Sequence, residues 1–196
     1  MSAALHINDA ERGTSLRVAP QRLAVVRAVL ALVWAAAVVL AIGDDVPTTH
    51  TGLPTAAALF LASYPLIDVI ASVLGSTFSD ARVLRINAAV SALAVVWIAI
   101  AAFGSDAGAT LVAFGAWAAV SGAIQLGIAI HRRRAESREL PMIVSGAVST
   151  IAGLSFIAAS GDDKAHLVTL AGYMTVGALL FLLWAGRRQA DPHEAR

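Results

Sequence analysis

Six long apolar runs, separated by short polar segments, constrain this chain more than any other feature of its sequence. Each run has 18 to 22 residues, and an α-helix needs about 20 residues to cross the hydrocarbon core of a bilayer. The runs are apolar on every side, which excludes the alternating strands of a membrane barrel. We therefore expect an all-α integral membrane protein with six transmembrane helices, at Leu23–Ile42, Leu53–Leu74, Ile86–Phe103, Ala109–Ile130, Leu140–Ala159 and Leu167–Ala185.

The composition supports this interpretation. Of the 196 residues, 58% are hydrophobic and only 14% are charged, and the mean hydropathy is +0.76. An ordinary soluble domain has roughly 25% charged residues, and a soluble domain of this size has too little interior to bury so much apolar surface. These figures exclude a soluble globular enzyme, a disordered protein and a nucleic-acid-binding protein. The chain also has no cysteine, so it has neither a disulfide nor a thiolate-ligated metal.

Positive charge alternates from one connecting segment to the next. Thirteen arginines belong to one set of segments and the single lysine, Lys164, belongs to the other. Because basic residues stay on the cytoplasmic side of a membrane, this pattern predicts that both termini are cytoplasmic. We expect a cytoplasmic tail over residues 1–21, a helical bundle over residues 22–187 and a second cytoplasmic tail over residues 188–196.

The chain also shows an internal repeat. Each loop opposite the arginines begins with a similar turn, and these turns are Gly43-Asp44-Asp45, Gly104-Ser105-Asp106 and Gly161-Asp162-Asp163. Aromatic residues occupy matching points of the second, fourth and sixth runs, 53 and 56 residues apart, at Tyr64, Trp117 and Tyr173. Four residues later stand Asp68, Ser121 and Gly177. A period of this length predicts one helical hairpin that is used three times.

Two of these segments carry a resemblance to a known family. The segment 63–69, Ser-Tyr-Pro-Leu-Ile-Asp-Val, resembles the tyrosine–aspartate signature in the second helix of the HdeD-like family. The segment 116–125, which contains Trp117 and Gly122 and precedes three arginines at 132–134, is similar to that family's fourth helix. The resemblance covers about residues 22–188. The chain differs from the family at Val69, where glycine is frequent, and at Gln125, where an acid is frequent.

The resemblance implies a multi-pass protein of the bacterial inner (plasma) membrane with a role in acid or envelope stress. It implies a non-enzymatic protein that acts through membrane lipids or through other proteins. In agreement with this, the chain has no catalytic motif, no cofactor motif and no reason to bind nucleic acid. The alternative is a small transporter or channel that moves protons or a small solute past Asp68.

Asp68 is the acid that stands inside an apolar run. A charged residue near the middle of a membrane-spanning helix costs roughly 2.5–3.5 kcal/mol on insertion scales, so Asp68 is expected to face the bundle and to find a polar partner. Arg27 is its natural ion partner. The polar residues expected at the same depth are Ser91, Ser121 and Gln125. Such a centre is either a structural tie between helices or a proton-titratable site.

The loops opposite the arginines form an acidic surface with two histidines. His50 follows one pair of aspartates and His166 follows another, and the aspartates are Asp44, Asp45, Asp162 and Asp163. Carboxylates favour the protonated imidazole, so this surface is a candidate pH sensor in which protonation draws the first and fifth loops together. The alternative is that Asp and Gly are simply the residues that tight turns need. The spacing matches no metal motif.

Small residues recur at helical spacing in the fourth and fifth runs. They are Gly115, Gly122, Gly146 and Gly153. Faces of small residues let helix backbones approach closely. We expect them to pack helices within the chain, while packing against a second copy of the chain or another membrane protein is the alternative.

The six-span topology makes a direct prediction. Reporter proteins fused at Met1 and at Arg196 should both be active in the cytoplasm, because an even number of spans returns the chain to its starting side. Reporters that give opposite locations for the two ends would rule out this topology.

Overall fold

The computed structural model describes residues 20–44, 47–76, 81–133 and 139–189. Within these ranges the chain forms six α-helices and no strand, which confirms the all-α prediction. The helices are α2 (Pro20–Ile42), α3 (Thr55–Gly75), α4 (Ala81–Gly104), α5 (Ala107–Arg133), α6 (Leu140–Ala159) and α7 (Val168–Gln189). Most of them begin or end a few residues outside the apolar runs. The two expected tails lie almost entirely outside the described residues.

All six helices are long and apolar enough to cross a membrane. Their outward faces carry large hydrophobic side chains that the bundle does not cover. Leu40 is 82% exposed, Leu93 is 72% exposed and Ile151 is 68% exposed. Soluble monomers rarely expose contiguous apolar surface of this kind, whereas lipid tails solvate it. These faces support the prediction of a multi-pass membrane protein.

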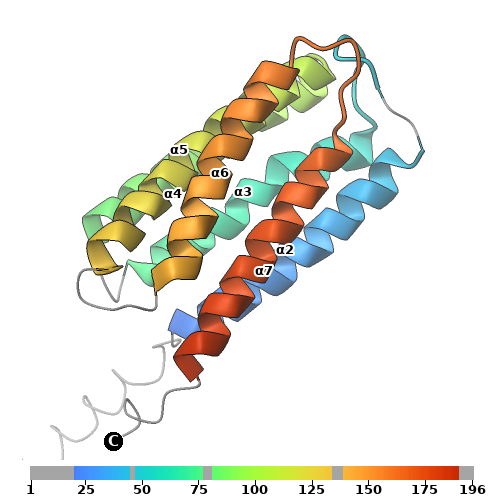
Figure 1. Cartoon of the computed structure of the whole chain (residues 1–196). Helices are drawn as coiled ribbons and strands as arrows, with labels where there is room; N and C mark the ends of the chain where they lie inside the picture. Colours follow the sequence, from blue (N-terminus) through green and yellow to red (C-terminus); the bar gives the residue numbers. More distant parts are fainter. Residues whose placement is uncertain (1–19, 45–46, 77–80, 134–138, 190–196) are drawn as a thin grey trace, which may run out of the picture.

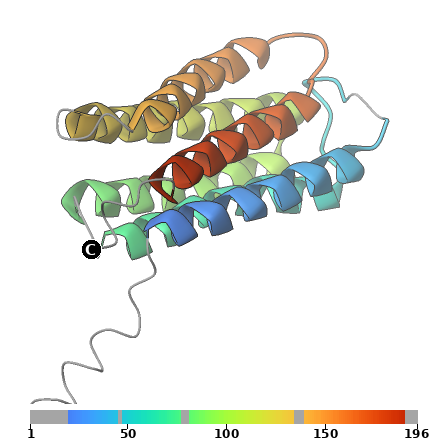
Figure 2. The ribbon, with the colours of Figure 1, turned by 60° about the horizontal axis from the view of Figure 1, so that its bottom comes forward.

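The helices form an elongated bundle in which each helix packs against its neighbours along the chain and α2 packs against α7 (Figures 1 and 2). The most extensive contacts join three helix pairs, α2–α7, α3–α4 and α5–α6. Contacts between α2 and α3, between α4 and α5, and between α6 and α7 are less extensive. The helices of each hairpin predicted from the sequence are therefore neighbours, but they are not the closest neighbours.

The two ends of the bundle differ in charge. One end, here called the basic end, is where α2 begins and α7 ends (Figure 1). Its described arginines are Arg22, Arg82, Arg85, Arg132, Arg133 and Arg187. The other end, here called the acidic end, holds the α2–α3 and α6–α7 loops (Figure 1). Its described aspartates are Asp44, Asp106, Asp162 and Asp163.

Glycines bring α5 and α6 into backbone contact. A Cβ atom added at Gly153 would lie 2.4 Å from the backbone nitrogen of Ala119 and 2.4 Å from the carbonyl oxygen of Gly115. One added at Gly122 would lie 2.7 Å from Ser149 Cβ, and one added at Gly146 would lie 2.6 Å from the backbone nitrogen of Leu126. The structure therefore places all four glycines singled out in the sequence at this one interface within the chain.

The loops at the acidic end are hydrogen-bonded to one another. The Ala165 N–H donates to the Pro47 carbonyl at 2.8 Å, and the Thr49 hydroxyl donates to the Asp162 carbonyl at 2.6 Å. The Gly108 N–H, at the start of α5, donates to the Thr49 carbonyl at 2.8 Å. The α2–α3 loop thus joins both the α6–α7 loop and α5.

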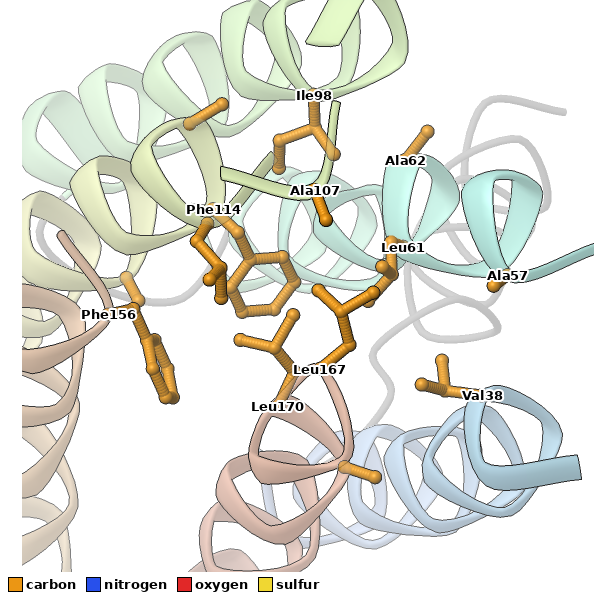
Figure 3. Packing of buried hydrophobic residues seen from close by; sticks show 14 of the residues in the cluster. Val38, Ala57, Leu61, Ala62, Ile98, Ala107, Phe114, Phe156, Leu167 and Leu170 are labelled. Atoms are coloured by element: carbon orange, nitrogen blue, oxygen red, sulfur yellow. The ribbon is translucent and has the colours of Figure 1, made fainter. Parts of the chain in front are cut away.

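A buried apolar core lies below these loops. Figure 3 shows Leu61 of α3, Phe114 of α5 and Leu170 of α7 pointing toward one another, together with Leu167 just before α7. All four side chains are at most 1% exposed. This core and the loops above it close the acidic half of the bundle.

The contact between α5 and α6 predicts opposite effects for two glycines of α5. Gly122→Ala should lower the free energy of unfolding by about 1–3 kcal/mol, because the added methyl group overpacks a closed interface. Gly127→Ala is the control, since a Cβ atom there meets nothing within 4 Å, and it should raise stability by up to about 1 kcal/mol. Unfolding in detergent micelles measures both changes. Equal stability of the two variants would contradict the close contact.

Candidate functional site

Asp68 lies in α3 and is only 3% exposed. One carboxylate oxygen forms an ion pair with the guanidinium of Arg27 from α2. The other accepts hydrogen bonds from the Asn87 side-chain amide at 2.7 Å and from the Ser91 hydroxyl at 2.7 Å, both in α4. Every partner is a donor, which is the arrangement that an ionised carboxylate requires.

The hydrogen bonds continue from Asp68 to a fourth helix, α5. The indole N–H of Trp117, in α5, donates to the Ser91 hydroxyl at 3.0 Å. The Asn87 amide also donates to the Ser72 hydroxyl at 2.9 Å. Because the Asn87 nitrogen makes two hydrogen bonds, its orientation is fixed, and its buried oxygen has no hydrogen-bond partner in the described part of the chain. The Asp68 network therefore connects α2, α3, α4 and α5.

Polar contacts join the three close helix pairs to one another. Each lies at one of the less extensive interfaces, where apolar packing holds the helices less firmly. The contacts are Arg27 with Asp68 between α2 and α3, Trp117 with Ser91 between α4 and α5, and Tyr173 with Ser149, at 3.4 Å, between α6 and α7. Polar side chains thus provide a link at every interface where the packing is weaker.

A cavity of about 470 Å³ extends from the basic end to Asp68. Residues of all six helices line it. Its apolar wall includes Leu23, Leu84, Ile124, Met142 and Trp184. Its polar lining is Arg27, Asp68, Ser72, Asn87, Ser121, Gln125, Arg132 and Glu139. The cavity has the size and the mixed lining of a site for a small organic molecule.

Five aromatic rings, here called the aromatic cluster, lie between this cavity and the acidic end. Phe114 is at the centre, with ring centroids 5.2 Å from Trp117, 5.9 Å from Tyr64, 6.0 Å from Tyr173 and 6.4 Å from Phe156. The three aromatic residues that match along the sequence therefore converge on one ring. The cluster fills the bundle where the polar lining ends.

The structure brings together most of the polar residues expected at one depth, although not all of them touch Asp68. Arg27 and Ser91 contact its carboxylate directly. Ser121 lines the same cavity without contacting it, and the Gln125 amide instead donates to the Met142 carbonyl at 3.4 Å. Asp68 thus has three direct partners from two helices.

Sequence reasoning missed four polar residues of the site, which are Ser72, Asn87, Arg132 and Glu139. Asn87 stands in the third apolar run, four residues before Ser91, and this helical spacing could have revealed it. Glu139 immediately precedes α6. In the structure Glu139 is 1% exposed, and it accepts a hydrogen bond of 3.4 Å from the Trp184 indole at the mouth of the cavity. Arg27 also makes a cation–π contact with Phe181 of α7, whose ring centroid lies 4.4 Å from its guanidinium carbon.

The histidines expected to sense pH lie apart from this site. His50 and His166 are both exposed at the acidic end, as are Asp44, Asp162 and Asp163, while Asp45 lies outside the described residues. The first and fifth loops are already joined by hydrogen bonds, and a pH-sensing role of the two histidines stays a prediction. Among residues 20–44, 47–76, 81–133 and 139–189, no three acidic or histidine side chains are grouped to hold a metal ion.

No protein-family model, no curated protein and no solved structure matches the chain. The similarity to the HdeD-like family therefore stays a prediction based on the segments quoted for it.

The burial of Asp68 predicts how the bundle responds to loss of its ion partner. Arg27→Ala should lower the free energy of unfolding by about 3–5 kcal/mol, because the variant leaves a buried carboxylate without its cation. Arg22→Ala, on the same helix at an exposed position, is the control and should change stability by less than about 0.5 kcal/mol. Denaturant titration in micelles measures both free energies of unfolding. Equal changes in the two variants would show that the ion pair does not stabilise the bundle.

Proposed function

We propose that this chain is a small transporter of the bacterial inner membrane, which binds a small solute at its basic end and moves the solute or a proton past the Arg27–Asp68 pair. The observation that carries this proposal is the cavity of about 470 Å³ that reaches Asp68. A scaffold protein would be expected to seal such a pair in packed apolar side chains. A transporter needs a path to it.

The proposal includes the orientation of the bundle. Its basic end faces the cytoplasm, as the distribution of arginines predicts, and both termini are therefore cytoplasmic. The proposal also includes a threefold repeat of helical hairpins. Two features support the repeat: Tyr64, Trp117 and Tyr173 meet at Phe114, and the second and third hairpins each have an aromatic-to-serine contact.

The cavity would be open to the cytoplasm while the acidic end is closed. The aromatic cluster and the hydrogen-bonded loops block the path from the cavity to the acidic end. Release on that side therefore requires the close helix pairs to move relative to one another. The less extensive interfaces between the pairs are where such motion costs least packing, and small movements of packed helices are a common means of domain closure.

A second candidate is the stress-related role implied by the family resemblance. The observation that favours it is that every partner of Asp68 is a donor and that the network ties four helices together. In that case the Asp68 network is structural, and the protein acts on lipids or on other proteins through its outer faces. Transport measurements separate the two candidates.

The transport proposal predicts flux in proteoliposomes. The wild-type protein should carry protons, followed with an entrapped pH dye, or small solutes such as glycerol and urea, followed by light scattering. Asp68→Asn should reduce this flux about tenfold or more, because the neutral amide leaves Arg27 without its counter-ion in a polar path. Asp163→Asn, the same change at an exposed position of the α6–α7 loop, should leave it unchanged.

A further variant tests transport in case Asp68→Asn loses its flux by misfolding. Ile128 lines the cavity. Ile128→Trp should fill part of the cavity without replacing either residue of the ion pair, and it should also reduce flux. Wild-type protein with no flux of any of these probes, or a filled cavity with normal flux, would contradict transport and favour the structural role.

A further inference from the structure

A small chamber lies beside the cavity, on the side of the aromatic cluster. Its volume is about 30 Å³. Arg27, Ser121, Gln125 and Phe181 line both the cavity and the chamber, so the two spaces share a wall. Tyr64, Trp117 and Tyr173 also line the chamber, which therefore extends from the ion pair to the aromatic cluster.

The chamber is unusually polar for its size. The hydroxyl, amide and guanidinium groups around it belong to Arg27, Tyr64, Ser121, Gln125, Ser145, Ser149 and Tyr173. The Tyr173 hydroxyl and the Ser149 hydroxyl are 3.4 Å apart, whereas hydroxyl pairs usually lie about 2.7–2.8 Å apart. Both groups therefore have capacity for a stronger partner.

We propose that this chamber is a water-binding site, and that the hydrated path from the basic end reaches past the Arg27–Asp68 pair to the Tyr173 hydroxyl. A buried space holds a water molecule when roughly 10–15 Å³ is open to it and two to four polar groups are available. The chamber meets both conditions.

The hydrated path ends at the aromatic cluster. Phe114 is fully buried and contacts the rings of Tyr64, Trp117 and Tyr173. Beyond it the core is apolar, with Leu61 and Leu170 (Figure 3). Apolar constrictions of this kind block passage by staying dry. The barrier between the two sides is thus the aromatic cluster, and the Arg27–Asp68 pair lies on its wet side.

Introduced cysteines test this inference, because the chain has none of its own. Gly177 lines the chamber, and a Cβ atom there meets nothing within 4 Å, so Gly177→Cys adds a thiol without strain. Val176→Cys is the matched control, since Val176 is next to Gly177 on the same helix and its side chain is exposed on the outside of the bundle. A thiol reacts as its thiolate, which forms only where water reaches it.

The reagent is the silver ion, which is close to water in size. Loss of the infrared S–H band measures its reaction with each variant in lipid nanodiscs. We expect Gly177→Cys to react about tenfold faster or more than Val176→Cys, because the chamber thiol has water around it while the thiol at 176 faces lipid tails. Ser149→Cys, which replaces a chamber hydroxyl by a thiol, should react like Gly177→Cys. Equal rates at 177 and 176, or no reaction at both chamber positions, would overturn the hydrated chamber.

This inference extends the proposed transport but is measured separately from it. Fast reaction in the chamber together with absent flux would overturn transport and leave the chamber hydrated. Flux together with an unreactive chamber would overturn the hydrated chamber and leave transport in place.

Discussion

The ion pair between Arg27 and Asp68 is the interaction on which the rest of the bundle depends. Each charge alone is costly inside a membrane, and removing either partner leaves the other uncompensated. The two residues belong to different close helix pairs, so satisfying both charges fixes α2–α7 against α3–α4. The same carboxylate orients Asn87 and Ser91, and Ser91 in turn receives the indole of Trp117.

Two kinds of contact hold this bundle together, which are close helix packing and polar contacts between side chains. Lipid tails are as apolar as the helix faces, so helices associate through close packing and hydrogen bonds. Within the pair α5–α6, glycines allow the backbones to touch. Between pairs, where packing is less extensive, single polar contacts take over. This division leaves space at the basic end, which is why the cavity lies among all six helices.

Much of the fold could be predicted from the sequence, because the length of an apolar run and the cost of a buried charge are local properties. These two properties were enough to predict the positions of the six helices and the pairing of Asp68 with Arg27. The glycine spacing likewise indicated a close interface. The partners of Gln125, the burial of Glu139 and the cavity itself depend on how side chains of different helices meet, and no spacing along one helix contains that information. The already joined outer loops escaped prediction because their contacts involve backbone carbonyls of Pro47 and Asp162.

The pairing of α2 with α7 has a consequence for the order in which the bundle is assembled. Residues 43–167 separate these two helices, and at typical rates of synthesis their translation takes on the order of ten seconds. The pairs α3–α4 and α5–α6 are consecutive and are able to form as they leave the ribosome. During this interval α2 lacks its main partner, and its contacts with α3 are able to form first, among them the Arg27–Asp68 pair and the hydrogen bond from Trp34 to Ser63. The polar pair is therefore available to hold α2 beside α3 before α7 has been made.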